Sequence, residues 1–132
     1  GYGDQYIVWL GIWKENIKQG LTTWAEDSGV EKARTDCHAW GASPNIEFFR
    51  VILGIDSDAP GFSKLKTEPH LGDIKQIGGE MPHPNGIIKV HYTTSKDKLR
   101  TVVKLPANTT GRLIWRGKEV TLNEGENRFV VE

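Results

Sequence analysis

The sequence contains one cysteine and one methionine among its 132 residues. A lone cysteine cannot form a disulfide within the chain, so a disulfide-rich scaffold is excluded and the redox compartment stays open. Its neighbour His38 does not complete a metal-ligand set, because no second cysteine or close histidine follows. We expect Cys37 to be a buried free thiol, and the sequence predicts neither a metal site nor a cofactor.

An excess of charge of one sign is also missing. The 17 Lys and Arg residues balance the 17 Asp and Glu residues. The chain therefore lacks the basic surface that nucleic acid requires, and it has no acidic tail. We expect no nucleic acid partner, whereas a neutral polar partner such as a saccharide suits this balance.

Long hydrophobic runs are absent as well. No apolar segment approaches the length of a membrane span, and the first residues lack the order of charged, apolar and small residues found in signal peptides. No membrane partner is expected, and the compartment is left open. A chain of 132 residues suffices for one ordinary domain, or for one small domain and a piece of another.

What is present divides into a helical part and a strand part. Within residues 4–18 apolar side chains recur at helical spacing, and Gly20 follows where a helix end favours a left-handed residue. We expect one amphipathic helix with Trp9 and Trp13 in a core. A single helix of this length needs other elements to pack against. Its apolar positions are Tyr6, Trp9, Leu10, Trp13 and Ile17.

A second helix is predicted after a long connection. Ser43 and Pro44 are typical of a helix cap and a first helical position, and Gly54 is typical of a helix end. The connection, residues 21–42, gathers carboxylates, an imidazole and large aromatics without core-like periodicity, and such long connections are usually functional. We expect the chemistry there. The apolar face of the second helix consists of Ile46, Phe49, Ile52 and Leu53, broadened by Phe48.

The second half of the chain changes to a period of two. Residues 56–62 are predicted to be a linker, because they contain Ala-Pro-Gly at 59–61. Beyond them apolar and polar residues alternate in short runs between turn sequences, which predicts about seven antiparallel strands in a β-sandwich. The runs lie near residues 64–67, 74–77, 88–92, 99–105, 113–115, 120–122 and 129–131.

Aromatic and histidine side chains in this half are interpreted as structural. Tyr92, Trp115 and Phe129 fall at inward positions of the alternation, so they favour a core over an exposed binding platform. The histidines are interpreted as surface or packing residues, and Asn-Thr-Thr at 108–110 as a turn. These histidines are His70, His83 and His91.

Five short motifs are recognisable in combination. They are Thr-Thr-Trp-Ala-Glu at 22–26, Asp-Cys-His-Ala-Trp-Gly-Ala-Ser-Pro at 36–44, Leu-Gly-Ile at 53–55, Pro-Gly-Phe at 60–62 and Glu-Pro-His-Leu-Gly-Asp at 68–73. Together they resemble the C-terminal part of bacterial α-L-rhamnosidases of glycoside hydrolase family 78. The resemblance extends over nearly the whole chain, which would be the last part of a much longer enzyme.

The resemblance implies an α+β chain in two parts. Residues 1–55 would be the terminal helices of an (α/α)6-barrel catalytic domain, residues 56–62 a linker, and residues 63–132 a C-terminal antiparallel β-sandwich. The implied partners are a rhamnose-containing glycoside or polysaccharide and the remainder of the parent enzyme. A periplasmic or secreted parent is compatible with this resemblance.

The same resemblance implies roles in the connection. Glu26 matches the general base of an inverting glycosidase, which stands about 6.5–9.5 Å from its partner acid, and that acid would lie upstream of this chain. His38 matches a histidine of the sugar subsite. Either Trp24 or Trp40 would pack against the methyl group of the deoxy-sugar, and Asp36 would orient His38. The isolated chain is then expected to be inactive.

Other interpretations stay open at this point. Glu26 on its own suits a solvated loop charge, and His38 on its own suits a core histidine. A free-standing carbohydrate-binding or interaction module is one alternative to the enzyme, and a related helical-toroid glycosidase acting on another sugar is a second. Exposed aromatic rings on one face of the sandwich would favour the binding module.

Overall fold

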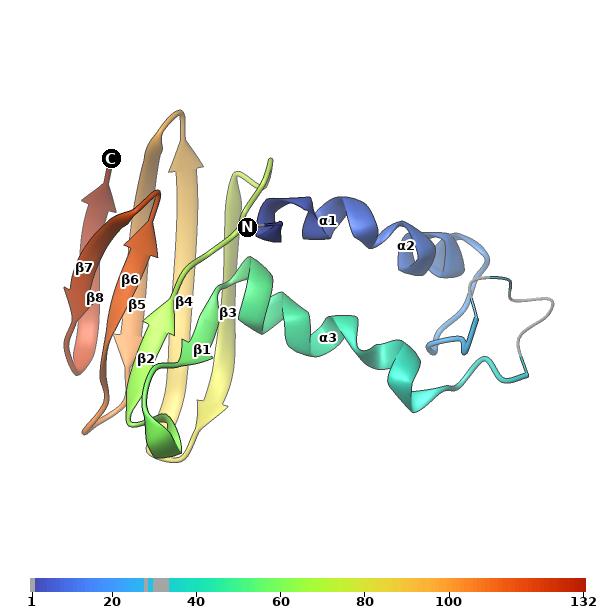
Figure 1. Cartoon of the computed structure of the whole chain (residues 1–132), viewed down its shortest axis with the longest axis horizontal. Helices are drawn as coiled ribbons and strands as arrows, with labels where there is room; N and C mark the ends of the chain where they lie inside the picture. Colours follow the sequence, from blue (N-terminus) through green and yellow to red (C-terminus); the bar gives the residue numbers. More distant parts are fainter. Residues whose placement is uncertain (1, 28, 30–33) are drawn as a thin grey trace.

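A computed structural model describes residues 2–27, 29 and 34–132. It shows two helical arms that project side by side from a sandwich of two β-sheets (Figure 1). The connection between the arms lies at the end away from the sandwich (Figure 1). The predicted order of helices first and strands second is therefore confirmed.

The first arm consists of η1 (Gly3–Gln5), α1 (Tyr6–Trp9) and α2 (Gly11–Lys18). The predicted helix is interrupted at Leu10, where ψ is 6°. The placement of Trp9 in a core is wrong, because its side chain is 54% exposed while Leu10 is 6% exposed. Only one side of this arm is covered by the rest of the described chain, so the other side of its apolar stripe stays open.

The second arm consists of η3 (Ala39–Ala42), α3 (Pro44–Glu47) and η4 (Phe48–Ile52), a π-helical segment. Pro44 takes the predicted first helical position, and Gly54 has the predicted positive φ of 70°. Ser43 does not cap the helix: its side chain makes no capping hydrogen bond, and its backbone is already helical. The reason is that η3 runs directly into α3, so no free helix start exists there.

Two side-chain hydrogen bonds join the arms. The Tyr6 hydroxyl donates to the carbonyl of Pro44 at 3.3 Å. The Trp13 indole Nε1 donates to the carbonyl of Gly41 at 2.8 Å. These bonds hold the antiparallel pair near the sandwich and again near its far end.

Eight strands are found in the described residues, arranged as two four-stranded sheets with orders β1-β2-β6-β7 and β3-β4-β5-β8. Each of the seven predicted runs overlaps a strand, although the run at 74–77 overlaps β3 only from residue 76, and β1 adds an eighth strand at the start of the interval predicted to be a linker. One pair departs from the antiparallel prediction: β2 runs parallel to β6. These strands are not neighbours in sequence, so no hairpin dictates their direction. Their bounds are β1 (Ile55–Ser57), β2 (Lys64–Thr67), β3 (Gln76–His83), β4 (Gly86–Ser95), β5 (Lys98–Leu105), β6 (Thr110–Trp115), β7 (Lys118–Leu122) and β8 (Gly125–Val131).

The main core lies between the two sheets and continues to the base of the second arm. Alternate residues of β5 are buried, as the period of two predicts. Tyr92 is fully buried, and Trp115 and Phe129 pack partly buried against the same core, in agreement with their predicted inward positions. The largest buried contributors include Ile55, Leu65, Ile88, Leu99, Leu113 and Leu122.

A buried polar group joins both sheets to the second arm. Thr67 Oγ1 on β2 and Tyr92 Oη on β4 each lie 3.2 Å from the Leu53 carbonyl oxygen, and 2.5 Å from each other. We call this arrangement the hydroxyl clasp. It satisfies a carbonyl at the end of the arm that would otherwise be orphaned, and burial raises the pKa of the Tyr92 hydroxyl.

Removing one hydroxyl from the clasp is expected to weaken folding. Tyr92→Phe should lower the free energy of unfolding by about 1–3 kcal/mol, because a buried acceptor loses a donor. The raised pKa means that the folded state favours the protonated Tyr92 hydroxyl. The contribution of this hydroxyl to the free energy of unfolding of the wild type should therefore be complete below about pH 10 and decrease above it. Tyr92→Phe should flatten that alkaline decline, as measured by urea unfolding between about pH 7 and pH 11.

The control for this change is Tyr2→Phe, since the Tyr2 side chain is 72% exposed. It should shift the free energy of unfolding by less than about 0.5 kcal/mol. Equal effects of the two substitutions would show that the clasp contributes no stability.

Candidate functional site

Four of the five predicted site residues lie in the tip loop, which we define as residues 21–38, and Trp40 follows it in η3. Residues 28 and 30–33 of this loop fall outside the described structure. The two described sides of this loop are joined by backbone hydrogen bonds. Glu26 N donates to Thr35 O at 3.1 Å, and His38 N donates to Trp24 O at 2.7 Å. The Thr23 hydroxyl donates to the carbonyl of Asp36. This pairing brings Glu26 and His38 into one neighbourhood.

A cavity of about 300 Å³ opens between α2 and the tip loop. It brings together Glu26, His38 and Trp40 of the predicted site residues. Trp24 lies in the wall of a neighbouring cavity of about 180 Å³ instead, and Asp36 does not line either. We call the cavity of about 300 Å³ the tip cavity. It is lined by Ile12, Trp13, Asn16, Ala25, Glu26, Asp27, His38, Trp40 and Gly41.

The Glu26 carboxylate sits at the rim of the tip cavity with its side chain 28% exposed. Its Oε1 lies 2.7 Å from the guanidinium of Arg34, whose side chain is 80% exposed. Such an exposed pair contributes little to stability. Among the described residues Arg34 is the side chain that bonds to this carboxylate, and it does so through Oε1.

His38 and Trp40 form an aromatic pair at the same cavity. Their ring centroids are 6.0 Å apart with an interplanar angle of 81°, an edge-to-face arrangement. The Trp40 side chain is 84% exposed, which is unusual for an indole and leaves its ring available for contact. In the described residues no hydrogen bond joins Asp36 to His38, and the Asp36 side chain is exposed.

The structure corrects the prediction for the single thiol. Cys37 is exposed and not buried. Its backbone N–H is bonded to the Thr35 hydroxyl at 3.1 Å. Adjacent residues in an extended run point to opposite sides, and His38 is the one that lines the cavity.

The sequence prediction missed the contribution of the first arm to this site. Trp13, expected in a core, lines the tip cavity and holds Gly41 through its indole N–H. Gly41 has no room for a side chain, because a Cβ there would lie 2.6 Å from the Ala25 carbonyl oxygen. Asn16 also lines the cavity; it is only 3% exposed and its Oδ1 has no hydrogen-bond partner among the described residues. In the sequence, Asn16 is a polar residue three positions after Trp13 within an otherwise apolar helix face. That exception was the signal that could have identified it as a site residue.

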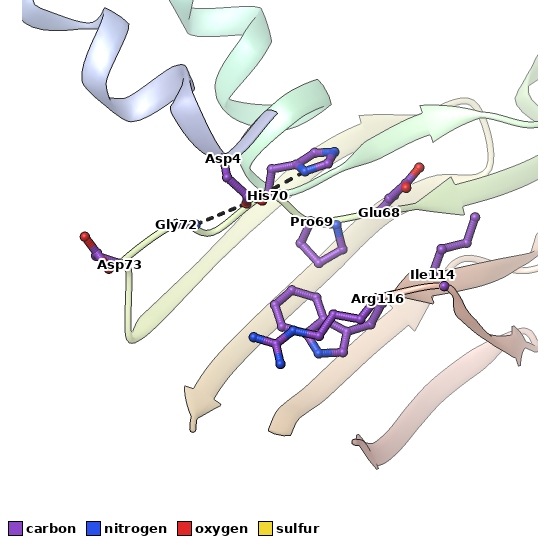
Figure 2. Close-up of a pocket in the computed structure, with 10 residues that line it drawn as sticks. Asp4, Glu68, Pro69, His70, Gly72, Asp73, Ile114 and Arg116 are labelled. Carbon is purple, nitrogen blue, oxygen red and sulfur yellow. Dashed lines mark hydrogen bonds and ion pairs between the residues drawn. The ribbon is translucent and has the colours of Figure 1, made fainter. Parts of the chain in front are cut away.

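A third cavity, of about 480 Å³, lies where the first arm meets the sandwich (Figure 2). Figure 2 shows Asp4 linking the N-terminal segment to the loop after β2: Asp4 Oδ1 is 3.8 Å from His70 Nδ1 and 3.4 Å from Gly72 N. The Arg116 guanidinium lies over the Trp115 ring, 5.5 Å from its centroid, so that face is not free for a sugar. The contacts of this cavity are those of a structural junction. Its remaining lining residues are Glu68, Pro69, Asp73, Ile114 and Gly117.

The histidines of the second half have structural contacts, as predicted. His83 Nε2 lies 2.9 Å from the Phe62 carbonyl oxygen and His91 Nε2 lies 3.1 Å from Gln76 Nε2. Asn108 has a positive φ of 56° in the predicted turn. Within the described ranges no cluster of three or more His, Cys, Asp or Glu side chains is suited to hold a metal ion. The helices of the described residues are too short or too polar to span a membrane.

Solved structures of α-L-rhamnosidases share this fold. The native enzyme from Aspergillus terreus matches with a TM-score of 0.79 and 19% identity, covering 90% of this chain and 15% of that chain. The enzyme from Streptomyces avermitilis, complexed with L-rhamnose, matches with a TM-score of 0.76 and 16% identity, covering 91% of this chain and 15% of that chain. The enzyme from Dictyoglumus thermophilum matches with a TM-score of 0.71 and 19% identity, covering 88% of this chain and 17% of that chain. This chain thus spans about a sixth of the length of these structures.

Sequence comparison identifies the family over more than half of the chain. No curated protein sequence gives a match. The family model described as the bacterial alpha-L-rhamnosidase C-terminal domain matches residues 54–129. The match begins at the end of the second arm and extends across the sandwich, and the tip cavity lies before it. The chain belongs to the bacterial alpha-L-rhamnosidase C-terminal domain family.

Proposed function

We propose that this chain is the C-terminal part of an enzyme that removes terminal α-L-rhamnose from glycosides or polysaccharides with inversion of configuration. In this proposal the helical arms, predicted as residues 1–55, end an (α/α)6 barrel, and the C-terminal sandwich predicted at 63–132 already includes β1 (Ile55–Ser57) from the predicted linker at 56–62. The likeness to solved α-L-rhamnosidases supports it, because coverage of about nine tenths of the chain must include the helical arms as well as the sandwich.

The open side of the arms supports a missing barrel. Large apolar side chains are exposed there in a number that a finished surface rarely shows. Trp9 is 54% exposed and Val8 is 75% exposed, although both lie in a helix. We propose that further helices of the parent enzyme cover this side. The other exposed apolar residues of the arms are Ile12, Ile17, Trp40, Ile46 and Phe48.

The observation that carries the function is the convergence of Glu26, His38 and Trp40 on the tip cavity. A carboxylate, an imidazole and an exposed indole are the groups that a glycosidase needs for proton transfer, hydroxyl recognition and packing against sugar C–H groups. We assign Glu26 as general base, His38 as a hydrogen-bonding partner of the sugar or water, and Trp40 as the ring that packs against the sugar.

Two further residues keep supporting roles in this proposal. Trp24 contributes its carbonyl to the hydrogen bond that positions His38, so we place it behind the site and give the sugar contact to Trp40. Asp36 remains the proposed orienting carboxylate for His38, and it would make that contact only in the complete enzyme, since no hydrogen bond joins the two in the described residues. The partner acid would come from the part of the enzyme that precedes this chain, about 6.5–9.5 Å from Glu26 in the inverting geometry.

Product stereochemistry tests the proposed function. The parent enzyme should release β-L-rhamnose first from an aryl α-L-rhamnoside, because Glu26 activates water on the face opposite the leaving group. Proton NMR of the anomeric region during the first turnovers gives the answer before mutarotation. Release of the α-anomer first would contradict inversion, and absence of hydrolysis with activity on another glycoside would move the proposal to a different sugar.

The chain by itself provides the matched control for that experiment. It lacks the proposed acid and most of the barrel, so it should produce no rhamnose under the same conditions. Turnover by the chain alone would show that both carboxylates lie within residues 1–132.

A further inference from the structure

The buried amide of Asn16 is not explained by the fold. Asn16 lies in the second half of α2 and is 3% exposed, yet its Oδ1 has no hydrogen-bond partner in the described part of the chain. Its backbone carbonyl accepts from Leu21 N at 3.1 Å, a role that any residue type fills. Asparagine is a modest helix former, and an unpaired buried acceptor costs free energy. An apolar residue of the same shape, such as leucine, would suit the fold better.

The surroundings of Asn16 indicate what the amide is for. It lines the tip cavity together with Ile12 and Trp13 of the same helix, which supply an apolar wall. The carboxylate of Glu26 and the imidazole of His38 line the same cavity. Asn16 also borders the neighbouring cavity of about 180 Å³, and its amide is the polar group of the first arm at the tip cavity. Buried polar groups without partners in native proteins call for a specific explanation, and a ligand is one of them.

We propose that Asn16 binds the substrate, its carboxamide forming a hydrogen bond with a ring hydroxyl of the sugar held between Glu26 and His38. This inference rests on the proposed function and adds a specificity residue to it. A carboxamide suits a hydroxyl because it offers both a donor and an acceptor, and a half-turn of the amide exchanges their positions. Because Oδ1 is itself buried, the side chain would turn toward the cavity so that the sugar hydroxyl becomes the hydrogen-bond partner of Oδ1.

The expected consequence is selectivity for one hydroxyl group. A site built to hydrogen-bond a hydroxyl discriminates against the analogue that lacks it, because a buried polar group is then left unpaired. In the parent enzyme, kcat/KM would be measured for aryl α-L-rhamnoside and for its 2-deoxy, 3-deoxy and 4-deoxy analogues. Wild type should lose about tenfold or more with the analogue that lacks the contacted hydroxyl.

Asn16→Leu, which keeps the side-chain shape, is the decisive variant. It should raise KM for the complete rhamnoside by about tenfold or more, and the penalty for one deoxy analogue should shrink to within about twofold. Its thermal midpoint should stay equal to that of wild type or rise, because the orphaned acceptor is gone. Asn16→Ser retains a hydrogen-bonding group, so its KM and its deoxy penalty should lie between those of wild type and those of Asn16→Leu. It also replaces Asn16→Leu in the test if that variant fails to fold. Gln19→Leu, an exposed polar-to-apolar change at the end of the same helix, is the matched control.

The outcomes separate this inference from the proposed function. A wild type that hydrolyses no α-L-rhamnoside overturns both. An active wild type whose deoxy penalties are unchanged in Asn16→Leu overturns the inference alone and leaves the proposed function intact. A drop in thermal midpoint with unchanged deoxy penalties would show that the amide has a structural partner in the rest of the enzyme. Loss of one deoxy penalty at an unchanged thermal midpoint supports the contact.

Discussion

Glu26→Ala in the parent enzyme is expected to lower kcat for an aryl α-L-rhamnoside by about three decades or more. General-base catalysis contributes about 10²- to 10⁴-fold in enzymes, and alanine removes the proposed group that takes the proton from water. KM should change little, because a base acts mainly in the transition state. The carboxylate lies at the rim of the tip cavity with one oxygen directed to Arg34, so its removal disturbs no buried contact.

Azide distinguishes a missing base from a damaged fold. It is a small anion that needs no deprotonation, so it replaces both the base and the water in the space that Glu26 vacates. With an activated rhamnoside, Glu26→Ala should recover rate in proportion to azide and form β-L-rhamnosyl azide. Mass spectrometry and NMR identify this product.

The control for this prediction is Glu15→Ala, which removes an exposed carboxylate of the first arm that is paired with Lys18. Its kcat should equal that of wild type. Retained activity in Glu26→Ala would make Glu26 a loop charge and place the base elsewhere. A loss without azide rescue, accompanied by a lower thermal midpoint, would indicate structural damage instead.

Gly54→Ala is expected to prevent stable folding. A Cβ at this position would lie 2.1 Å from the Glu68 carbonyl carbon and 2.3 Å from its oxygen. Both are backbone atoms, so rotation of a side chain cannot relieve the overlap. The residue also has a φ of 70°, which costs a side-chain-bearing residue about 1–2 kcal/mol by itself. The combined loss should exceed about 4 kcal/mol, which urea unfolding of the chain measures directly.

Gly117→Ala separates conformational strain from overlap. Gly117 has a φ of 80°, and a Cβ at this position would meet no described atom within 4 Å. Only the conformational cost of about 1–2 kcal/mol should therefore appear. Similar losses in the two variants would mean that the Glu68 backbone moves to accommodate the new methyl group.

Local patterns in the sequence predicted most of the strands but not their arrangement. Alternation identified β4 and β5 because one face of each is buried and the other meets solvent. It missed β1, since three residues between a helix end and the Pro60 turn carry too little pattern. The parallel pairing of β2 with β6 was beyond reach, because pairing between distant strands depends on the packing of the whole sandwich.

The candidate site was predicted mainly through the resemblance of its motifs. Glu26 and His38 have no distinctive periodicity, and on their own they suit a surface charge and a packing residue. Asn16 was overlooked because a periodic apolar face draws attention to its apolar members, whereas the informative residue was the polar exception. Trp9 was misplaced for a related reason: an apolar stripe predicts burial, but it does not say that the covering elements belong to the same stretch of chain.

The hydroxyl clasp bears on how motion passes along the molecule. Thr67 belongs to one sheet and Tyr92 to the other, and both meet at the carbonyl of Leu53. Sliding of one sheet over the other, or tilting of the second arm, would therefore pull at least one hydroxyl away from a buried acceptor. These contacts favour a rigid joint between the second arm and the sandwich over a hinge, and they tie the position of the arm to both sheets. The sandwich, although it lies at the opposite end of the arms from the tip loop, then sets the alignment of the second arm.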